Sequence, residues 1–164
     1  MEKNNKKTEK PTKINEIDND KITKYLNSIF GNCSNGLQSI HDILPNVENE
    51  KLKQELKEEY TYYQVIYRKC EDFAKKYDLQ IKDNNWFKKA RMYASIKMTT
   101  ITNKKTRKLA EMLVLGTVMG LNECYKNKWD FEGVSEELDV LLDELQNLQE
   151  NYYKNLKSFL KKNI

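Results

Sequence analysis

The feature of this sequence that most constrains its fold is a heptad spacing between residues 52 and 77. Side chains recur there at alternating steps of four and three residues, which places them on one face of a helix, as in the seam of a coiled coil. The members of this seam are Leu52, Leu56, Glu59, Tyr63, Ile66, Cys70, Phe73 and Tyr77. We therefore predict a helix from Glu50 to Tyr77 that buries this face against other helices.

The rest of the chain shows helical spacing in four more segments, at residues 20–44, 85–101, 104–127 and 134–161. Pro45 is expected to end the first of them, and the short connection after it requires the next helix to run back antiparallel. The β-branched run that begins at Thr99, followed by Asn103, predicts a break near Thr99–Lys104. The chain has only five Gly and two Pro, so it holds few turn residues, and this composition also favours helices over sheets.

The order of these segments is a helix pair, a basic crossover segment and a second helix pair. The pairs resemble each other, because Glu-x-x-Tyr recurs in the second helix of each, at Glu59–Tyr62 and at Glu150–Tyr153. Two hairpins joined by a long crossover form the topology of ferritin-like bundles. We predict an all-α fold, an antiparallel four-helix bundle of ferritin-like type, with an additional amphipathic crossover helix between the two helix pairs. Residues 1–18 are expected to form a disordered tail, and residues 19–164 a single helical-bundle domain.

Two stretches of the sequence carry a resemblance to a known family. They are SIKMTTITNKKTRKLAEMLVLGTVMGLNE, which begins at Ser95, and LQENYYKNLKSFL, which begins at Leu148. They resemble a family of small ferritin-like proteins of clostridia and related Firmicutes, and the similarity covers about residues 22–160. Its most specific part is AEMLVLGTVMG. The resemblance implies a ferritin-like bundle, and it supplies neither an activity nor functional residues.

Several features point to a cytoplasmic protein. The N-terminal residues contain no apolar stretch of the kind that a secretory signal needs. The longest apolar run, residues 109–121, contains Glu111 and is too short to span a bilayer. The three cysteines, Cys33, Cys70 and Cys124, are far apart in sequence and each lies on an apolar helical face, so we expect buried, reduced thiols.

A ferritin-like di-metal centre requires a Glu from each of two helices and a Glu-x-x-His from each of the other two. Here tyrosines occupy both His positions, and the one histidine, His41, lies near a helix end, so a complete di-iron site and a bound cofactor are not expected. The candidates for a degenerate metal site are Glu59, Tyr62, Glu111, Glu123, Glu150 and Tyr153. We expect Glu59 to hydrogen-bond a tyrosine such as Tyr62 or a basic neighbour. The alternative is a buried acid or metal ligand with a raised pKa.

Positive charge is concentrated between Lys82 and Lys108, where nine basic residues face one acid, about +8 in all. The candidates for a polyanion-binding patch are Lys88, Lys89, Arg91, Lys97, Lys104, Lys105, Arg107 and Lys108. Such a segment could bind an anionic membrane or a nucleic acid backbone. We favour a solvated face that the acidic last helix, with Glu136, Glu137 and Asp143 among its acids, neutralises. No nucleic-acid-binding motif accompanies the charge.

The helix expected at residues 104–127 is apolar on nearly all sides, so we expect neighbours to cover most of it. The pair Gly116 and Gly120 should allow one neighbour to approach closely. No set of residues has the types that a known catalytic chemistry requires. The function we favour is therefore non-catalytic, through contacts with another protein or with a second copy of this chain. The alternatives are a degenerate metal-binding protein and a basic-surface binder of anionic membrane or nucleic acid.

Overall fold

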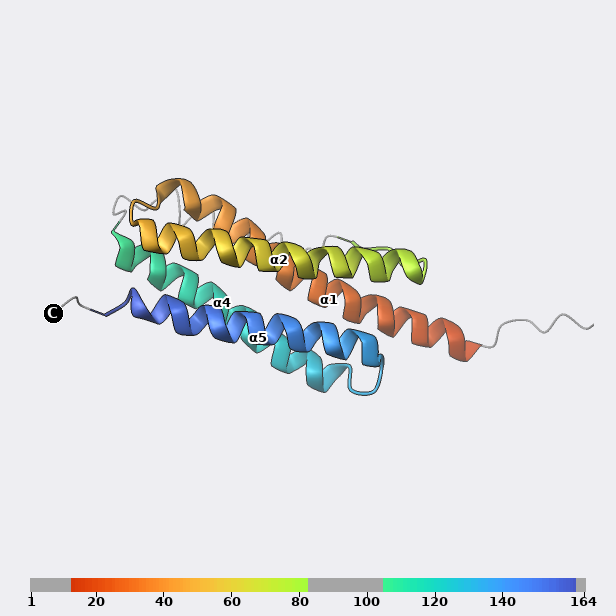
Figure 1. Ribbon diagram of the computed structural model, residues 1–164. Helices are drawn as coiled ribbons and strands as arrows, with labels where there is room; N and C mark the ends of the chain where they lie inside the picture. Colours follow the sequence, from red (N-terminus) through yellow and green to blue (C-terminus); the bar gives the residue numbers. More distant parts are fainter. Residues whose placement is uncertain (1–12, 83–104, 162–164) are drawn as a thin grey trace, which may run out of the picture.

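The computed structural model describes residues 13–82 and 105–161, and all regular elements among them are helices (Figure 1). These elements are α1 (Lys13–Ile43), the short 3-10 turn η1 (Leu44–Asn46), α2 (Glu50–Lys76), α4 (Thr106–Asp130) and α5 (Glu136–Ser158). The predicted all-helical fold is confirmed for this part of the chain. The crossover helix expected at residues 85–101 and the break near Thr99–Lys104 lie outside the described residues.

Local sequence signals set the helix starts. The Asn49 side chain accepts a hydrogen bond from the backbone N–H of Leu52 at 3.0 Å and so caps α2. Ser135 caps α5 in the same way, with the N–H of Leu138 at 3.3 Å. The turn before it contains Gly133 at φ 73°, a conformation that favours glycine.

The first helix begins earlier than expected. It starts at Lys13 rather than near Asp20, so residues 13–18, which were expected to belong to a disordered tail, lie inside α1. The physical reason is that the sequence has neither Gly nor Pro between Pro11 and Gly31, so nothing in it breaks the helix before residue 20. The last helix is shorter than expected, because Ser135 fixes its start and it ends at Ser158.

Each long helix runs antiparallel to its two neighbours. On α1, Asn27 donates to the carbonyl of Gln80 beyond the end of α2, whereas Cys33 donates to the carbonyl of Tyr63 inside it, so the two chains run in opposite directions. Bonds between α1 and α4, between α2 and α5, and between α4 and α5 give opposite directions for those pairs as well. As a consequence α2 ends at one end of the bundle and α4 begins at the other (Figure 1).

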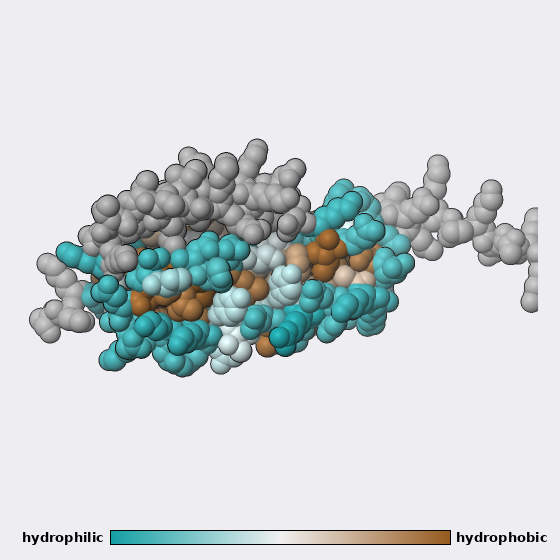
Figure 2. Space-filling view, turned by 90° about the horizontal axis from the view of Figure 1, so that it is seen from above, coloured by the Kyte–Doolittle hydropathy of each residue, from teal (hydrophilic) through white to brown (hydrophobic). Residues whose placement is uncertain are grey.

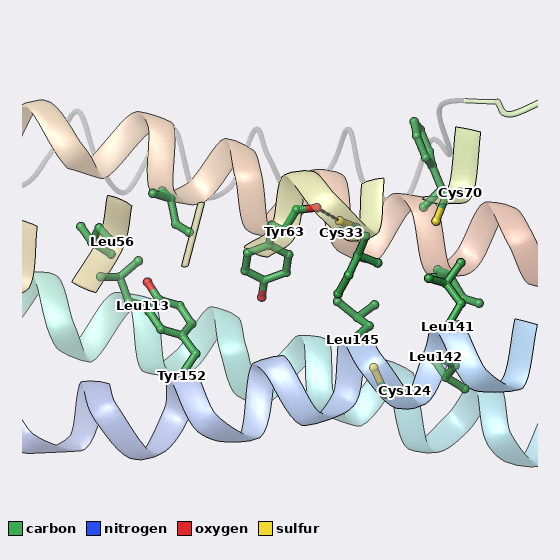
Figure 3. Packing of buried hydrophobic residues seen from close by; sticks show 14 of the residues in the cluster. Cys33, Leu56, Tyr63, Cys70, Leu113, Cys124, Leu141, Leu142, Leu145 and Tyr152 are labelled. Carbon is green, nitrogen blue, oxygen red and sulfur yellow. Dashed lines mark hydrogen bonds between the residues drawn. The ribbon is translucent and has the colours of Figure 1, made fainter. Parts of the chain in front are cut away.

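The core lies between the four helices and includes the seam predicted at residues 52–77 (Figure 3). All members of the 52–77 seam are buried except Tyr77, which is 47% exposed. Tyr77 follows the last residue of α2, and its hydroxyl donates to Glu137 at 2.8 Å on the surface.

The three cysteines are free and buried, as predicted. Figure 3 shows the Cys33 thiol pointing to the carbonyl oxygen of Tyr63, at 3.0 Å. Burial raises the pKa of the Cys70 and Cys124 thiols to about 12, so both stay protonated at neutral pH.

Hydrophilic side chains cover most of the described part of the face shown in Figure 2, and hydrophobic ones appear in patches between them. Among the described residues, no helix combines the length and the apolar character that crossing a membrane requires.

Candidate functional site

Near its middle the apolar core is crossed by a group of polar side chains, here called the polar layer, to which each long helix contributes one member: Asn32, Tyr63, Cys124 and Gln149. The Gln149 amide donates to Asn32 Oδ1 at 2.8 Å and to the Tyr63 hydroxyl oxygen at 3.2 Å. The Asn32 amide donates to the carbonyl oxygen of Gly120 at 2.9 Å. All four side chains are at most 4% exposed, so their hydrogen bonds replace those that water would make.

Two glycines make room for the polar layer. A Cβ atom on Gly120 would lie 2.5 Å from Gln149 Nε2, and one on Gly36 would lie 2.5 Å from Cζ of the Tyr63 ring. The expected close approach at Gly120 is therefore confirmed. The expectation for Gly116 is wrong, because a Cβ there would meet no atom within 4 Å. Gly116 lies on an exposed side of α4, which no neighbouring helix covers.

Next to the polar layer lie two buried polar atoms without a partner. Glu59 is 4% exposed, and its Oε1 accepts no hydrogen bond from the described residues. The hydroxyl of Tyr152, which is 2% exposed, also has no partner among them. The pKa of Tyr152 is raised mainly by burial, secondly by Tyr63 and thirdly by Glu59. Glu59 of α2 and Tyr152 of α5 therefore occupy the same region of the core.

The expectation that a tyrosine such as Tyr62 or a basic residue would satisfy Glu59 is wrong. Tyr62 is 57% exposed and lies on the surface of α2, since it is one position away from the seam. Burial, and secondly the Glu55 carboxylate, raise the pKa of Glu59 to about 8. Glu59 is therefore largely protonated at pH 7, which removes most of the energetic cost of burying a charge.

The inward-facing pair of α5 is Gln149 and Tyr152, whereas the sequence pattern suggested Glu150 and Tyr153. Glu150 accepts hydrogen bonds from Tyr125 at 3.2 Å and from Gln146 at 2.8 Å near the surface, and these hold its pKa below the ordinary value. Tyr153 is half-buried, with the Lys157 ammonium 5.1 Å from the centre of its ring. Neither residue of the second Glu-x-x-Tyr motif is therefore buried in the core.

The other two candidate ligands also lie away from Glu59. Glu111 pairs on the surface of α4 with Arg107 at 3.0 Å and with Lys108 at 2.9 Å. Glu123 accepts a hydrogen bond from Ser28 at 3.2 Å between α1 and α4. In the part of the chain that the structure describes, no three His, Cys, Asp or Glu side chains come close enough together to hold a metal ion.

Most of the candidate polyanion patch, Lys88, Lys89, Arg91, Lys97 and Lys104, lies outside the described residues. The exception is the stretch that opens α4, with Lys105 exposed and both Arg107 and Lys108 paired with Glu111 on their own helix. This stretch is at the opposite end of the bundle from the start of α5, because α4 and α5 are antiparallel (Figure 1).

For that reason the acids at the start of α5 lie far from Lys105, Arg107 and Lys108, and for residues 83–104 the expected neutralisation lies outside the described residues. The partners of these acids come from elsewhere. Glu137 pairs with Lys76 at 3.1 Å and Glu144 with Lys69 at 2.6 Å, both on α2. Asp143 pairs with Lys128 at the far end of α4, at 2.7 Å. These pairs join α5 to both of its neighbours.

The expectation that neighbours cover most sides of α4 is also wrong. Leu115, Val118 and Met119 are 54%, 44% and 47% exposed. The side of α4 opposite its buried face carries a run of exposed residues, here called the outer stripe: Leu115, Val118, Met119, Asn122, Tyr125 and Trp129. Five of its positions, 115, 118, 122, 125 and 129, follow the same alternation of three and four residues as a coiled-coil seam.

The outer stripe was missed at the sequence level although its spacing is visible there. The buried face of α4, with Leu113, Thr117 and Cys124 among its members, has the same spacing, and the sequence does not say which face the bundle covers. No protein-family model, curated protein or solved structure matches this chain.

Proposed function

We propose that this chain is a non-catalytic helical-bundle protein that acts through protein–protein contacts made by the outer stripe of α4. The observation that carries the proposal is the exposure of Leu115, Val118 and Met119 on one side of a single helix. Side chains of this kind gain about 25 cal/mol for each Å² of apolar surface that a partner removes from water. A contiguous apolar strip with polar borders is typical of an interaction surface.

The interior gives further support. The polar layer satisfies itself, since Gln149 bonds both Asn32 and Tyr63, and Asn32 also bonds the backbone of α4. It is sealed from solvent, as is Glu59 beside it. A substrate would find no route to these groups without opening the bundle, whereas a partner protein can reach the outer stripe directly.

We also propose that the bundle is of ferritin-like type. The support is the direction of its helices: α1 and α2 form one antiparallel pair, α4 and α5 form another, and the connection between the pairs has to pass from one end of the bundle to the other. The three free, buried thiols fit a reducing compartment, and we propose the cytoplasm.

The proposed contact can be tested by site-specific crosslinking in cells that express the protein. A photoreactive phenylalanine derivative at position 118 should give a crosslinked product of higher mass upon illumination. The matched control is the same derivative at Val65, which is 47% exposed on α2 compared with 44% for Val118. No product at position 118, or equal products at both positions, would show that the outer stripe is not a contact surface.

A further inference from the structure

We infer that the partner of the outer stripe is a second copy of this chain, with the two α4 helices packed antiparallel across a two-fold axis. This inference rests on the proposed function and identifies the partner of the same surface. A two-fold contact brings one patch against itself, so the patch has to be complementary to itself in shape and charge. The exposed apolar side chains of the outer stripe, Leu115, Val118 and Met119, lie near the middle of α4, where such an axis can pass.

The charges on either side of these apolar residues decide whether the two α4 helices run parallel or antiparallel. Towards the start of α4 lie Arg107 and Glu111, and towards its end lie Lys126 and Asp130. If the two-fold axis passes between Val118 and Met119, Glu111 of one copy lies opposite Lys126 of the other, because both are equally far from the axis along the helix. Arg107 lies opposite Asp130 by the same count. Each attractive pair occurs twice, whereas a parallel arrangement would set each charge against its own copy.

Trp129 also agrees with this register. Trp129, which is 85% exposed, lies opposite Lys108 of the second copy, where the ammonium and its aliphatic stem can cover the indole ring. Lys126 and Asp130 form no ion pair with the described residues of their own chain, so they are available to the second copy.

The inference is tested by sedimentation velocity of the purified full chain from about 1 µM to about 500 µM, a range that brackets the weak affinity expected for one helix per copy. The wild type should change from monomer to dimer within this range. Val118→Glu should stay monomeric, because it places two carboxylates at the axis. The matched control Val65→Glu should behave as the wild type. Circular dichroism should show unchanged helix content in both, since both positions are on the surface.

A charge exchange tests the register itself. Glu111→Lys alone and Lys126→Glu alone should each weaken the homodimer roughly tenfold, because two attractive pairs become repulsive. An equal mixture of the two variants should form a heterodimer of nearly wild-type affinity, since one chain then has only basic groups at these positions and the other only acidic ones. A mixture no stronger than the separate variants would overturn the antiparallel register.

The second-copy inference is overturned if the wild type stays monomeric at all concentrations. It is also overturned if Val65→Glu weakens the dimer as much as Val118→Glu does. If such a monomer still gives a crosslink from position 118 to another protein in cells, the outer stripe remains a contact surface and only its occupant was wrong. If neither a dimer nor a crosslink is found, the proposed function fails as well.

Discussion

Glu59 should make the stability of this bundle depend on pH in an unusual direction. Its pKa is raised from the ordinary 4.5 to about 8 in the folded chain. Between these two pH values Glu59 in the folded protein holds a proton that the unfolded chain has already released. The contribution of Glu59 to stability is therefore highest at low pH, falls as pH rises, and levels off above pH 8. At about 1.4 kcal/mol for each pKa unit, the fall amounts to about 5 kcal/mol in all, and to about 3 kcal/mol between pH 6 and pH 9.

The assay is denaturant unfolding at pH 6 and at pH 9 for the wild type and Glu59→Gln, which keeps the shape of the side chain without the ionisation. At pH 6 the two should differ little, and at pH 9 the variant should be more stable by about 3 kcal/mol. Glu59→Leu should be neutral or stabilising at pH 6, because it also removes the unpartnered oxygen. The matched control is Glu58→Gln on the exposed side of α2.

Two results would contradict this reasoning. A Glu59→Gln variant that follows the wild type from pH 6 to pH 9 would show that Glu59 does not titrate in this range. The same gain from Glu58→Gln would show that the charge of the whole surface, and not burial, is responsible. The thiols of Cys70 and Cys124, whose pKa burial raises to about 12, also lower stability towards pH 9, but equally in the wild type and in the variants, so the comparison cancels their effect.

Three other perturbations test the packing around the polar layer. Gly120→Ala should destabilise the fold by about 1–3 kcal/mol, because its Cβ would displace the bonded amide of Gln149, whereas Gly116→Ala should be neutral or slightly stabilising in thermal unfolding. Gln149→Leu should lower the free energy of unfolding by about 2–4 kcal/mol in denaturant unfolding, since it leaves Asn32 Oδ1 and the Tyr63 hydroxyl without their donor. An unchanged free energy of unfolding would show that the hydrogen bonds of the polar layer do not stabilise the fold. The native thiols should react with a soluble disulfide reagent only as fast as the chain unfolds, and rapid reaction of Cys33 in native buffer would contradict its complete burial.

The helices and their inner faces could be predicted from the sequence, because local spacing decides them. The seam of α2 is the clearest case, since every step between Leu52 and Phe73 is three or four residues. The helix ends could be predicted as well, because they depend on single residues. Asn49 caps the start of α2 with its side chain, and Pro45 lies in the 3-10 turn that follows the end of α1.

The register of α5 could not be predicted in the same way. From Leu145 the seam can step to Leu148 or to Gln149 before it reaches Tyr152, and both paths use steps of three and four residues. Apolarity favours Leu148, yet Gln149 is the buried one. The choice depends on Asn32 and on the space beside Gly120, which become neighbours of α5 only in the folded bundle.

That Glu59 has no hydrogen-bond partner among the described residues could not be predicted from the sequence for a similar reason. The spacing correctly placed this acid on a buried face, but the other side chains at that depth come from α5 and are fixed by the same register. The exposed face of α4 could not be predicted for a different reason. Hydrophobic residues surround the helix, and only the positions of α1 and α5 leave Leu115, Val118 and Met119 uncovered.

The claim that two copies meet at the outer stripe is tested most directly by a disulfide between chains. Val118→Cys places one new exposed thiol near the proposed two-fold axis, while the three native thiols stay buried. Mild oxidation at a concentration where the chain is dimeric should give a covalent dimer of Val118→Cys, and Val65→Cys, treated in the same way, should stay monomeric. Two chains that fail to join through position 118, or that join equally well through position 65, would contradict the account.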